Sequence, residues 1–464
     1  MITLSIDPGT VAGLGAEERV LFSELLQVYL ANSSGNEKKR KYYEGKISLN
    51  DVNLGLALPD GMRRLEIGCA WGTKAVDVLA SRSMFDGYVD MNGQAVEALA
   101  PIVAGNNLLV EYGKASRSEL TYGCTFATLS ADDRLGAKIR FHSPRTSAAK
   151  WDGDRGRIAC GFAIIDAAPD NSQAGTWTPN LINLYTDDAV WVMLREGSQW
   201  YSRAFPQRMD RPLMEAMVWA STSEKPFGRS RIKEPVRRLI DGYVRTIANA
   251  SIGLEFATAP QKYILGVTDE QYTALIDNKF RQYVGSIIAS TTNPETGEKP
   301  SFGQLQQGSL TPHADMLRML SAQFAAATGL TVSDVGVVTD ANPTSAEAIL
   351  AQSQTLISTA EQLNASNGDA LRTIALMALA IANNTSMDRL SEEEKSIMAH
   401  FKNPAMPSVA ATADAAVKIA GARQGFAETD VFLEMLGFSQ ADIRRIRAQE
   451  QLARGTAILQ EMGI

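Results

Sequence analysis

The chain has 464 residues, 45% hydrophobic and 21% charged, which is the composition of a globular protein with about two to four domain-sized units. Its formal net charge of −7 argues against a sequence-specific nucleic-acid-binding domain, since such domains are usually basic. Three scattered cysteines, Cys69, Cys124 and Cys160, indicate neither a disulfide framework nor a zinc site. The first residues lack a signal-peptide pattern, and the longest apolar run, 374–382, is far shorter than the roughly 20 residues that span a bilayer.

The first part of the chain is expected to be helical. Apolar residues at helical spacing predict a helix over 15–33, and further helices are expected over 62–85 and 93–105. Four consecutive cations at 38–41 follow the first of these helices. We interpret them as a solvated helix face, with an anion-binding site as the alternative.

Residues 122–205 have the pattern of an antiparallel β region rich in hairpins. Alternating apolar residues and β-branched or aromatic runs are separated by turn signals such as Asp-Gly and Glu-Gly-Ser. Two acidic pairs, at 132–133 and 187–188, fall in these predicted turns. Aspartate is favoured there because it bonds to the local backbone, so we do not expect a metal or catalytic role.

A basic amphipathic segment follows, over 224–267. Apolar residues recur every three or four positions from Ile232 to Leu254, which predicts a long helix over 230–257. Lysine and arginine residues are dense around its start. Such a helix can pack sideways on its neighbours while presenting charge to a polyanion.

The remaining third alternates between helices and irregular segments. A mixed insert over 261–312 contains a strand-like stretch at 262–267 and a helical stretch at 269–284. A second amphipathic helix is expected over 313–327. After a glycine-bounded segment, Thr344 and Glu347 form a capping box that starts a helix reaching Leu363. Another helix is expected over 369–383, and the tail after Pro407 is expected to be helical.

The two amphipathic helices around the insert favour oligomerisation. Each apolar stripe is too long to be covered by one partner helix. Side-by-side packing of several copies in a ring would cover both stripes. The arrangement also suggests a hairpin-like projection that carries the insert at its tip.

One stretch of the sequence is similar to the cofactor-binding motif of an enzyme class. Residues 64–73, RLEIGCAWGT, resemble the glycine-rich turn of class I S-adenosylmethionine methyltransferases, in which Gly68 and Gly72 would let the backbone approach the cofactor. Ala70 replaces the middle glycine, however, and no Asn/Asp-Pro-Pro-aromatic signature follows. The chain also lacks a phosphate-binding P-loop, a Gly-x-Ser-x-Gly elbow and a histidine cluster. We therefore predict no catalytic, cofactor-binding or metal-binding residues and a structural role.

Several short stretches, in this order, resemble a known family. They are YYEG at 42–45, AVDVLASR at 75–82, PFGRSRI at 226–232, PQKYILGV at 260–267, AAATGL at 325–330 and NPTSAEAI at 342–349. They resemble the portal proteins of tailed bacteriophages, the head-to-tail connector subunits, of the long-tailed phage type. The chain departs from the family pattern at Ala70, where asparagine is usual, at Lys262, where arginine is usual, and at Thr331, where proline is usual.

The resemblance implies an α+β portal fold with named regions. These are a mixed α/β wing (1–223), a first stem helix (224–258), a small α/β clip (259–312), a second stem helix (313–328), a tunnel loop (329–343), a long helix with a return to the wing (344–406) and a helical crown (407–464).

The resemblance also implies a function without enzyme activity. The chain would form a dodecameric ring at a capsid vertex of the virion, assembled in the host cytoplasm. Double-stranded DNA would pass through its channel during packaging and ejection. Expected partners are the terminase large subunit, which would supply the ATPase, the major capsid protein, a scaffold and head-completion adaptors. The alternatives are the methyltransferase and another ring-forming head-tail adaptor.

Two groups of candidate residues follow from the resemblance. Candidates for contact with DNA in the channel, or for salt bridges between subunits, are Arg229, Arg231, Lys233, Arg237, Arg238 and Arg245. Candidates from the tunnel loop are Thr331, Val332, Ser333, Asp334, Val335, Gly336, Val337, Val338, Thr339 and Asp340.

Overall fold

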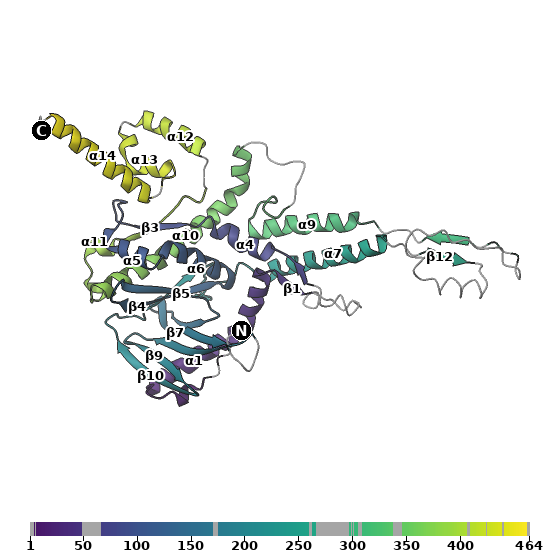
Figure 1. Ribbon diagram of the computed structural model, residues 1–464, viewed down its shortest axis with the longest axis horizontal. Helices are drawn as coiled ribbons and strands as arrows, with labels where there is room; N and C mark the ends of the chain where they lie inside the picture. The colour runs from purple at the N-terminus through teal and green to yellow at the C-terminus, as the bar shows by residue number, and fades with distance from the viewer. Residues whose placement is uncertain are drawn as a thin grey trace. The chain divides into compact units, whose positions relative to one another are not determined.

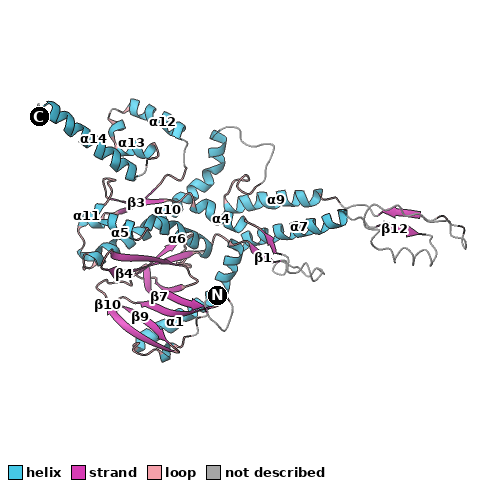
Figure 2. Ribbon diagram, in the orientation of Figure 1, coloured by secondary structure: helices cyan, strands magenta, loops and turns pink. Residues whose placement is uncertain are grey.

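The computed structural model contains two compact units of mixed helices and strands (Figures 1 and 2). It describes residues 4, 6–48, 66–169, 175–258, 262–265, 297, 299, 301–304, 309–336, 346–405, 409–423, 425–438 and 440–461. Unit 1 comprises Met1–Gly45, Ala70–Arg237 and Ala325–Ile464, and unit 2 comprises Lys46–Cys69 and Arg238–Phe324. The described strands pair antiparallel, which confirms the predicted α+β class.

Unit 1 contains a five-stranded antiparallel sheet in the order β10-β9-β8-β7-β6. Its strands are β6 (Ser147–Asp152), β7 (Arg157–Pro169), β8 (Trp177–Tyr185), β9 (Ala189–Glu196) and β10 (Gln199–Pro206). Helix α1 (Ala16–Tyr43) covers one face of this sheet. Because alternate strand residues share a face, Phe162, Ile182 and Met193 are all buried in the cluster that contains Phe22 and Leu25 of α1.

A second sheet in unit 1 has the order β11-β4-β5. Its strands are β4 (Cys124–Asp132), β5 (Gly136–His142) and β11 (Met214–Val218). Helices α6 (Leu108–Tyr122) and α10 (Ala346–Ala382) both contact β4. The antiparallel β region predicted over 122–205 is confirmed, whereas α6 was missed because its polar residues hide the helical period.

Helix α10 is continuous, so the prediction of two separate helices over 344–383 is wrong. The predicted break between Leu363 and 369 contains asparagines and Gly368, which favour turns. In the fold, Asn367 is fully buried and hydrogen-bonded, and residues 374–380 are buried on all sides. Tertiary packing therefore overrides the weak local helix propensity. The predicted cap at Thr344 lies outside the described residues.

Short elements complete unit 1. They are η1 (Pro8–Thr10), α4 (Trp71–Ala80), β3 (Phe85–Val89), η2 (Glu97–Leu99), α5 (Ala100–Gly105), η3 (Met387–Arg389), α11 (Glu392–Lys395) and β14 (Met398–Phe401). Strand β3 pairs antiparallel with β14. The helix predicted over 62–85 is therefore wrong at both ends. Glu66–Gly68 form a strand, β2, and after Ala80 the chain turns at 81–84 and enters β3.

The end of the chain is helical, as predicted for the residues after Pro407. Its helices are α12 (Val409–Ala422), η4 (Phe426–Glu428), α13 (Asp430–Met435) and α14 (Gln440–Glu461). The Arg447 guanidinium of α14 bonds to the Asp430 carboxylate of α13 at 2.6 Å and to Glu450 at 2.7 Å.

Unit 2 contains most of two long helices, α7 (Glu234–Thr258) and α9 (Thr311–Thr328), which run side by side (Figure 1). Ile240, Val244 and Ala248 form a buried stripe on α7. A Cβ at Gly242 would lie only 3.2 Å from Leu320 of α9, so the two helices approach closely. Both helices confirm the sequence prediction within a few residues.

Two small two-stranded sheets also belong to unit 2. Strands β1 (Lys46–Ser48) and β2 (Glu66–Gly68) pair with each other, as do β12 (Lys262–Leu265) and β13 (Ser301–Gln304). Strand β12 confirms the strand-like stretch predicted at 262–267. The helix expected over 269–284 lies outside the described residues.

Candidate functional site

The segment 226–233, which leads into α7, is held on the sheets of unit 1. The Phe227 ring meets the Phe126 and Trp151 rings edge to face, with centroids 5.6 and 5.9 Å apart. Gly228 has a φ of +67°, and a Cβ there would lie 2.1 Å from the Trp219 carbonyl oxygen. Only glycine fits this position, because the backbone is left-handed and the neighbouring carbonyl leaves no space.

The next residues bond to the end of α6. The Ser230 hydroxyl donates to the Thr121 carbonyl at 2.6 Å and accepts from the Ile232 amide at 3.0 Å. The Arg231 amide donates to the Leu120 carbonyl at 2.8 Å. The predicted helix start upstream of residue 234 is therefore wrong, since these backbone and side-chain bonds hold the segment in a non-helical path.

Arg231 is an internal anchor. Its side chain is buried, and its guanidinium donates to the Ala75 carbonyl of α4 and to the Thr328 carbonyl at the end of α9. The carboxyl end of a helix carries partial negative charge and favours a cation. Burial lowers the pKa of Arg231 to about 10, so it remains charged at neutral pH. The prediction that Arg231 faces DNA or a neighbouring subunit is contradicted by this burial.

Arg237 is also engaged within unit 1. It is half-buried, donates to the Ile232 carbonyl at 2.8 Å, and lies over the Tyr42 ring at 6.0 Å from its centroid.

Two of the four cations at 38–41 are also engaged. Lys39 donates to the Tyr122 carbonyl at 2.9 Å, and Arg40 bonds to Glu44 at 2.8 Å. The interpretation of the cations at 38–41 as one solvated helix face is therefore wrong.

The other candidate cations lie nearer the surface. Arg229 and Lys233 have exposed side chains in unit 1. In unit 2, Arg238 is exposed and Arg245 is half-buried. Arg238 and Arg245 are two turns apart on α7 and lie on one face of it, because residues spaced by seven share a helix face.

Six of the tunnel-loop candidates, Thr331–Gly336, form a capped turn. The Thr331 hydroxyl donates to the Asp334 carboxylate at 2.8 Å, and it accepts from the Asp334 amide at 3.2 Å. The Asp334 carboxylate also accepts from the Thr331 amide at 3.0 Å. The T-x-x-D spacing could have predicted this reciprocal cap, which depends on the threonine that replaces proline. Candidates 337–340 lie outside the described residues.

The methyltransferase-like stretch is not a cofactor site. Strand β2 pairs antiparallel with β1, whereas the enzyme fold requires a parallel sheet at this point. A Cβ at Gly72 would lie 2.0 Å from the Tyr42 carbonyl oxygen. Gly72 therefore permits α4 to pack against the end of α1, and the methyltransferase alternative is wrong.

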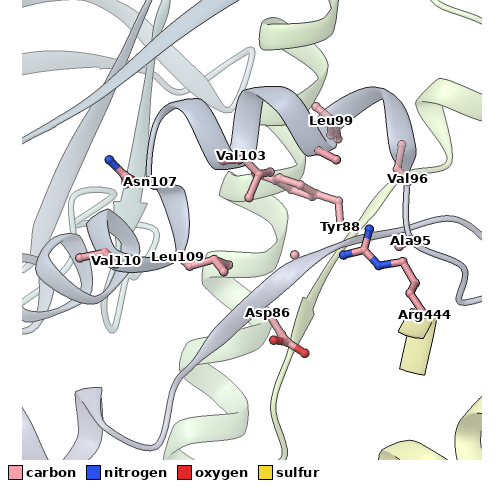
Figure 3. A pocket seen from close by; sticks show the side chains of 13 residues that line it. Asp86, Tyr88, Ala95, Val96, Leu99, Val103, Asn107, Leu109, Val110 and Arg444 are labelled. Atoms are coloured by element: carbon pink, nitrogen blue, oxygen red, sulfur yellow. The ribbon is translucent and has the colours of Figure 1, made fainter. Parts of the chain in front are cut away.

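One pocket of about 510 Å³ lies in unit 1 (Figure 3). Its walls are mainly apolar and include Leu99, Val103 and Leu109. Asp86 of β3 and Arg444 of α14 are its only charged lining residues within the described ranges. Since neither has a nucleophile or a histidine beside it in the lining, we assign no catalysis to this pocket.

Two kinds of feature are absent from the residues described above. No group of three or more histidine, cysteine, aspartate and glutamate side chains there could hold a metal ion. No helix in those ranges is both long and apolar enough to cross a membrane.

Comparison with known proteins found one family and related phage proteins. The family model described as "Phage portal protein, SPP1 Gp6-like" matches residues 24–455. The portal protein of Mycobacterium phage D29 is 25% identical over 469 residues, which cover 96% of this chain and 92% of that protein. The portal protein of Mycobacterium phage L5 is 25% identical over 467 residues, which cover 96% of this chain and 91% of that protein.

Similar solved structures come from gene transfer agent (GTA) particles. A chain in the virion of the native particle has a TM-score of 0.44 and 12% identity, covering 79% of this chain and 89% of that chain. A chain in the neck of the native particle, computed with C12 symmetry, has a TM-score of 0.44 and 13% identity, covering 80% and 90%.

Proposed function

Because the chain belongs to the phage portal protein family of the SPP1 Gp6-like type, we propose that it forms a dodecameric ring at one vertex of the capsid. Double-stranded DNA enters and leaves the head through the channel of this ring. The observation that carries the proposal is the family match over residues 24–455, which is nearly the whole chain. The two mycobacteriophage relatives support it, because each aligns over more than nine-tenths of its own length.

The regions of the subunit follow the same proposal. Residues 1–223 are the wing, 224–258 and 313–328 the two stem segments, 259–312 the clip, 329–343 the tunnel loop, 344–406 the long helix and wing return, and 407–464 the crown. The anchored start of α7 supports this division, since a channel wall needs helices whose base does not move. Arg231 lies just before α7 and supplies that anchor. Its guanidinium bonds to Ala75 of α4 and to Thr328, the last residue of α9.

The role of the ring is structural and not catalytic. An ATPase, the terminase large subunit, docks on the clip and drives the DNA. The major capsid protein, a scaffold and head-completion adaptors contact the other regions, and the ring is assembled in the host cytoplasm and stays in the virion.

Charge supports weak, non-specific contact with DNA. An acidic chain makes few phosphate contacts, so passing DNA is not held tightly. The exposed cations Arg229, Lys233 and Arg238 provide local positive charge that guides the DNA backbone. Salt bridges between subunits are the alternative role for the same side chains.

Two experiments test the proposal. Light scattering and electron microscopy of the purified chain are expected to show rings, with a particle mass near twelve times 50.2 kDa for a dodecamer. Deletion of the gene from its phage is expected to leave heads without DNA. Heads that fill with DNA but lack tails would instead identify an adaptor and overturn the proposal.

A further inference from the structure

A carboxyl group lies completely buried between two helices of unit 1. Glu119 of α6 has no exposed surface, and its Oε2 accepts a hydrogen bond from Asn367 Nδ2 at 2.9 Å. Asn367 lies in α10 and is equally buried. Its Nδ2 also donates to the Tyr112 hydroxyl at 3.1 Å, which lies 2.6 Å from the Ser83 hydroxyl. This polar cluster therefore joins α10 to α6 and to the turn after α4.

Two atoms of the cluster lack partners among the described residues. Glu119 Oε1 and Asn367 Oδ1 are both buried, and neither makes a hydrogen bond. An ionised carboxylate has no donor, so it would leave two acceptors unsatisfied in a dry interior, at high cost. A protonated carboxyl has one O–H donor, and an amide carbonyl beside it is a suitable acceptor.

We propose that Glu119 is a neutral acid in the folded subunit, and that its Oε1–H donates to Asn367 Oδ1. The two side chains then form a two-bond acid–amide pair, which we call the α6–α10 latch. Loss of the proton places a carboxylate against the amide carbonyl and weakens the attachment of α10. The latch belongs to a single subunit, so it holds whether or not the chain forms a ring.

The surroundings favour the neutral acid. Burial raises the pKa of Glu119 to about 8, and the bond from Asn367 only partly offsets this effect. The titratable groups that interact with it electrostatically are the Tyr112 phenol on α6 and the Cys124 thiol on β4. Burial raises the pKa of both groups, that of Cys124 to about 12. Both stay neutral at neutral pH and cannot compensate a charge on Glu119.

The sign of the pH effect follows from these values. The pKa of Glu119 is raised in the folded state, from 4.5 to about 8. Between those two values the unfolded chain has released a proton that the folded chain still binds. The contribution of Glu119 to the folding equilibrium constant therefore falls by about tenfold per pH unit across this interval and levels off above it.

The first test compares the full-length chain with Glu119→Gln and Glu119→Ala in urea unfolding across this pH interval. Glutamine preserves the latch without a proton, because its amide N–H replaces the acid O–H. In this pH interval, we expect unfolding of the parent chain to release one proton more than unfolding of Glu119→Gln. We also expect Glu119→Gln to remain more stable than Glu119→Ala. An unchanged pH slope in Glu119→Gln, or equal loss of stability in both variants, would overturn the proposal.

A second test does not depend on global unfolding. Hydrogen exchange of α10 amides around Asn367 is expected to accelerate with pH beyond the intrinsic rate in the parent chain, but not in Glu119→Gln. Ser366→Ala is the matched control, because it removes a neighbouring α10 bond, to the Val218 carbonyl at 2.9 Å, that does not titrate. Equal pH dependence of local opening in the parent chain and Glu119→Gln would contradict the latch.

Discussion

The guanidinium of Arg231 donates a hydrogen bond to the carbonyl of Thr328, across 97 positions of the chain. Arg231 precedes α7, and Thr328 ends α9. The bond therefore joins two parts of unit 1, one a few residues before the chain enters unit 2 and one a few residues after it returns. A second bond from the same guanidinium to Ala75 extends the connection to α4.

Replacing Arg231 by alanine should destabilise the protein strongly. The change removes both guanidinium hydrogen bonds and leaves unfilled space beside α4 and the end of α9, and we expect a loss of about 3 kcal/mol in the free energy of unfolding. Chemical unfolding measures this loss. Arg229→Ala is the control, because Arg229 is exposed and should change stability by less than about 0.5 kcal/mol. Equal effects of the two substitutions would show that Arg231 is not an anchor.

Replacing Gly228 by alanine should also destabilise the protein. The left-handed backbone costs an alanine about 1 kcal/mol, and the clash with the Trp219 carbonyl should add at least as much again. Gly197→Ala provides the comparison, because Gly197 has a φ of +63° but no atom within 4 Å of its Cβ position. The difference between the thermal unfolding midpoints of the two variants measures the effect of the clash with the Trp219 carbonyl. Equal decreases in the two midpoints would contradict the prediction.

Reversing charge at the start of α7 should impair DNA packaging or ring assembly. The variant Arg237→Glu/Arg238→Glu changes one exposed cation and one that contacts Tyr42. The single variant Arg238→Glu reverses the exposed charge without removing the contact of Arg237 with Tyr42, and Arg238→Lys retains the charge. Ring formation by electron microscopy and packaging by nuclease protection separate the two roles.

The two measurements show whether Arg237 and Arg238 contact DNA or a neighbouring subunit. Intact rings with reduced packaging indicate guidance of DNA, and loss of rings indicates salt bridges between subunits. Normal rings and normal packaging in the double variant would rule out both roles.

Removing the hydroxyl of Thr331 should open the turn at 331–336. Thr331→Ala loses a reciprocal bond with Asp334, and loss of such a cap typically costs about 1 kcal/mol. Hydrogen exchange at the Asp334 and Gly336 amides should become faster, whereas exchange in α9 should not change. Unaltered exchange at Asp334 would show that its backbone is held by the Thr331 carbonyl alone.

Local patterns predicted the regular elements that have a clear period. Helices α7 and α9 and the strands from β4 to β10 follow from apolar spacing, since a helix or strand buries one face. The same reasoning failed at Gly368, which lies inside α10, and at residues 81–85, which were assigned to a helix that ends at Ala80. In both places the decisive contacts come from residues distant in the chain.

The order of short stretches along the chain sufficed to predict the family, whose model matches residues 24–455. Sequence alone also placed a basic cluster at the start of α7. Only the tertiary structure decided which of these cations meet water and which are internal. Arg229 and Arg231 are two positions apart, yet one is exposed and the other is buried against α4 and the end of α9. Burial depends on segments that meet only in the fold, so no local pattern could separate the two.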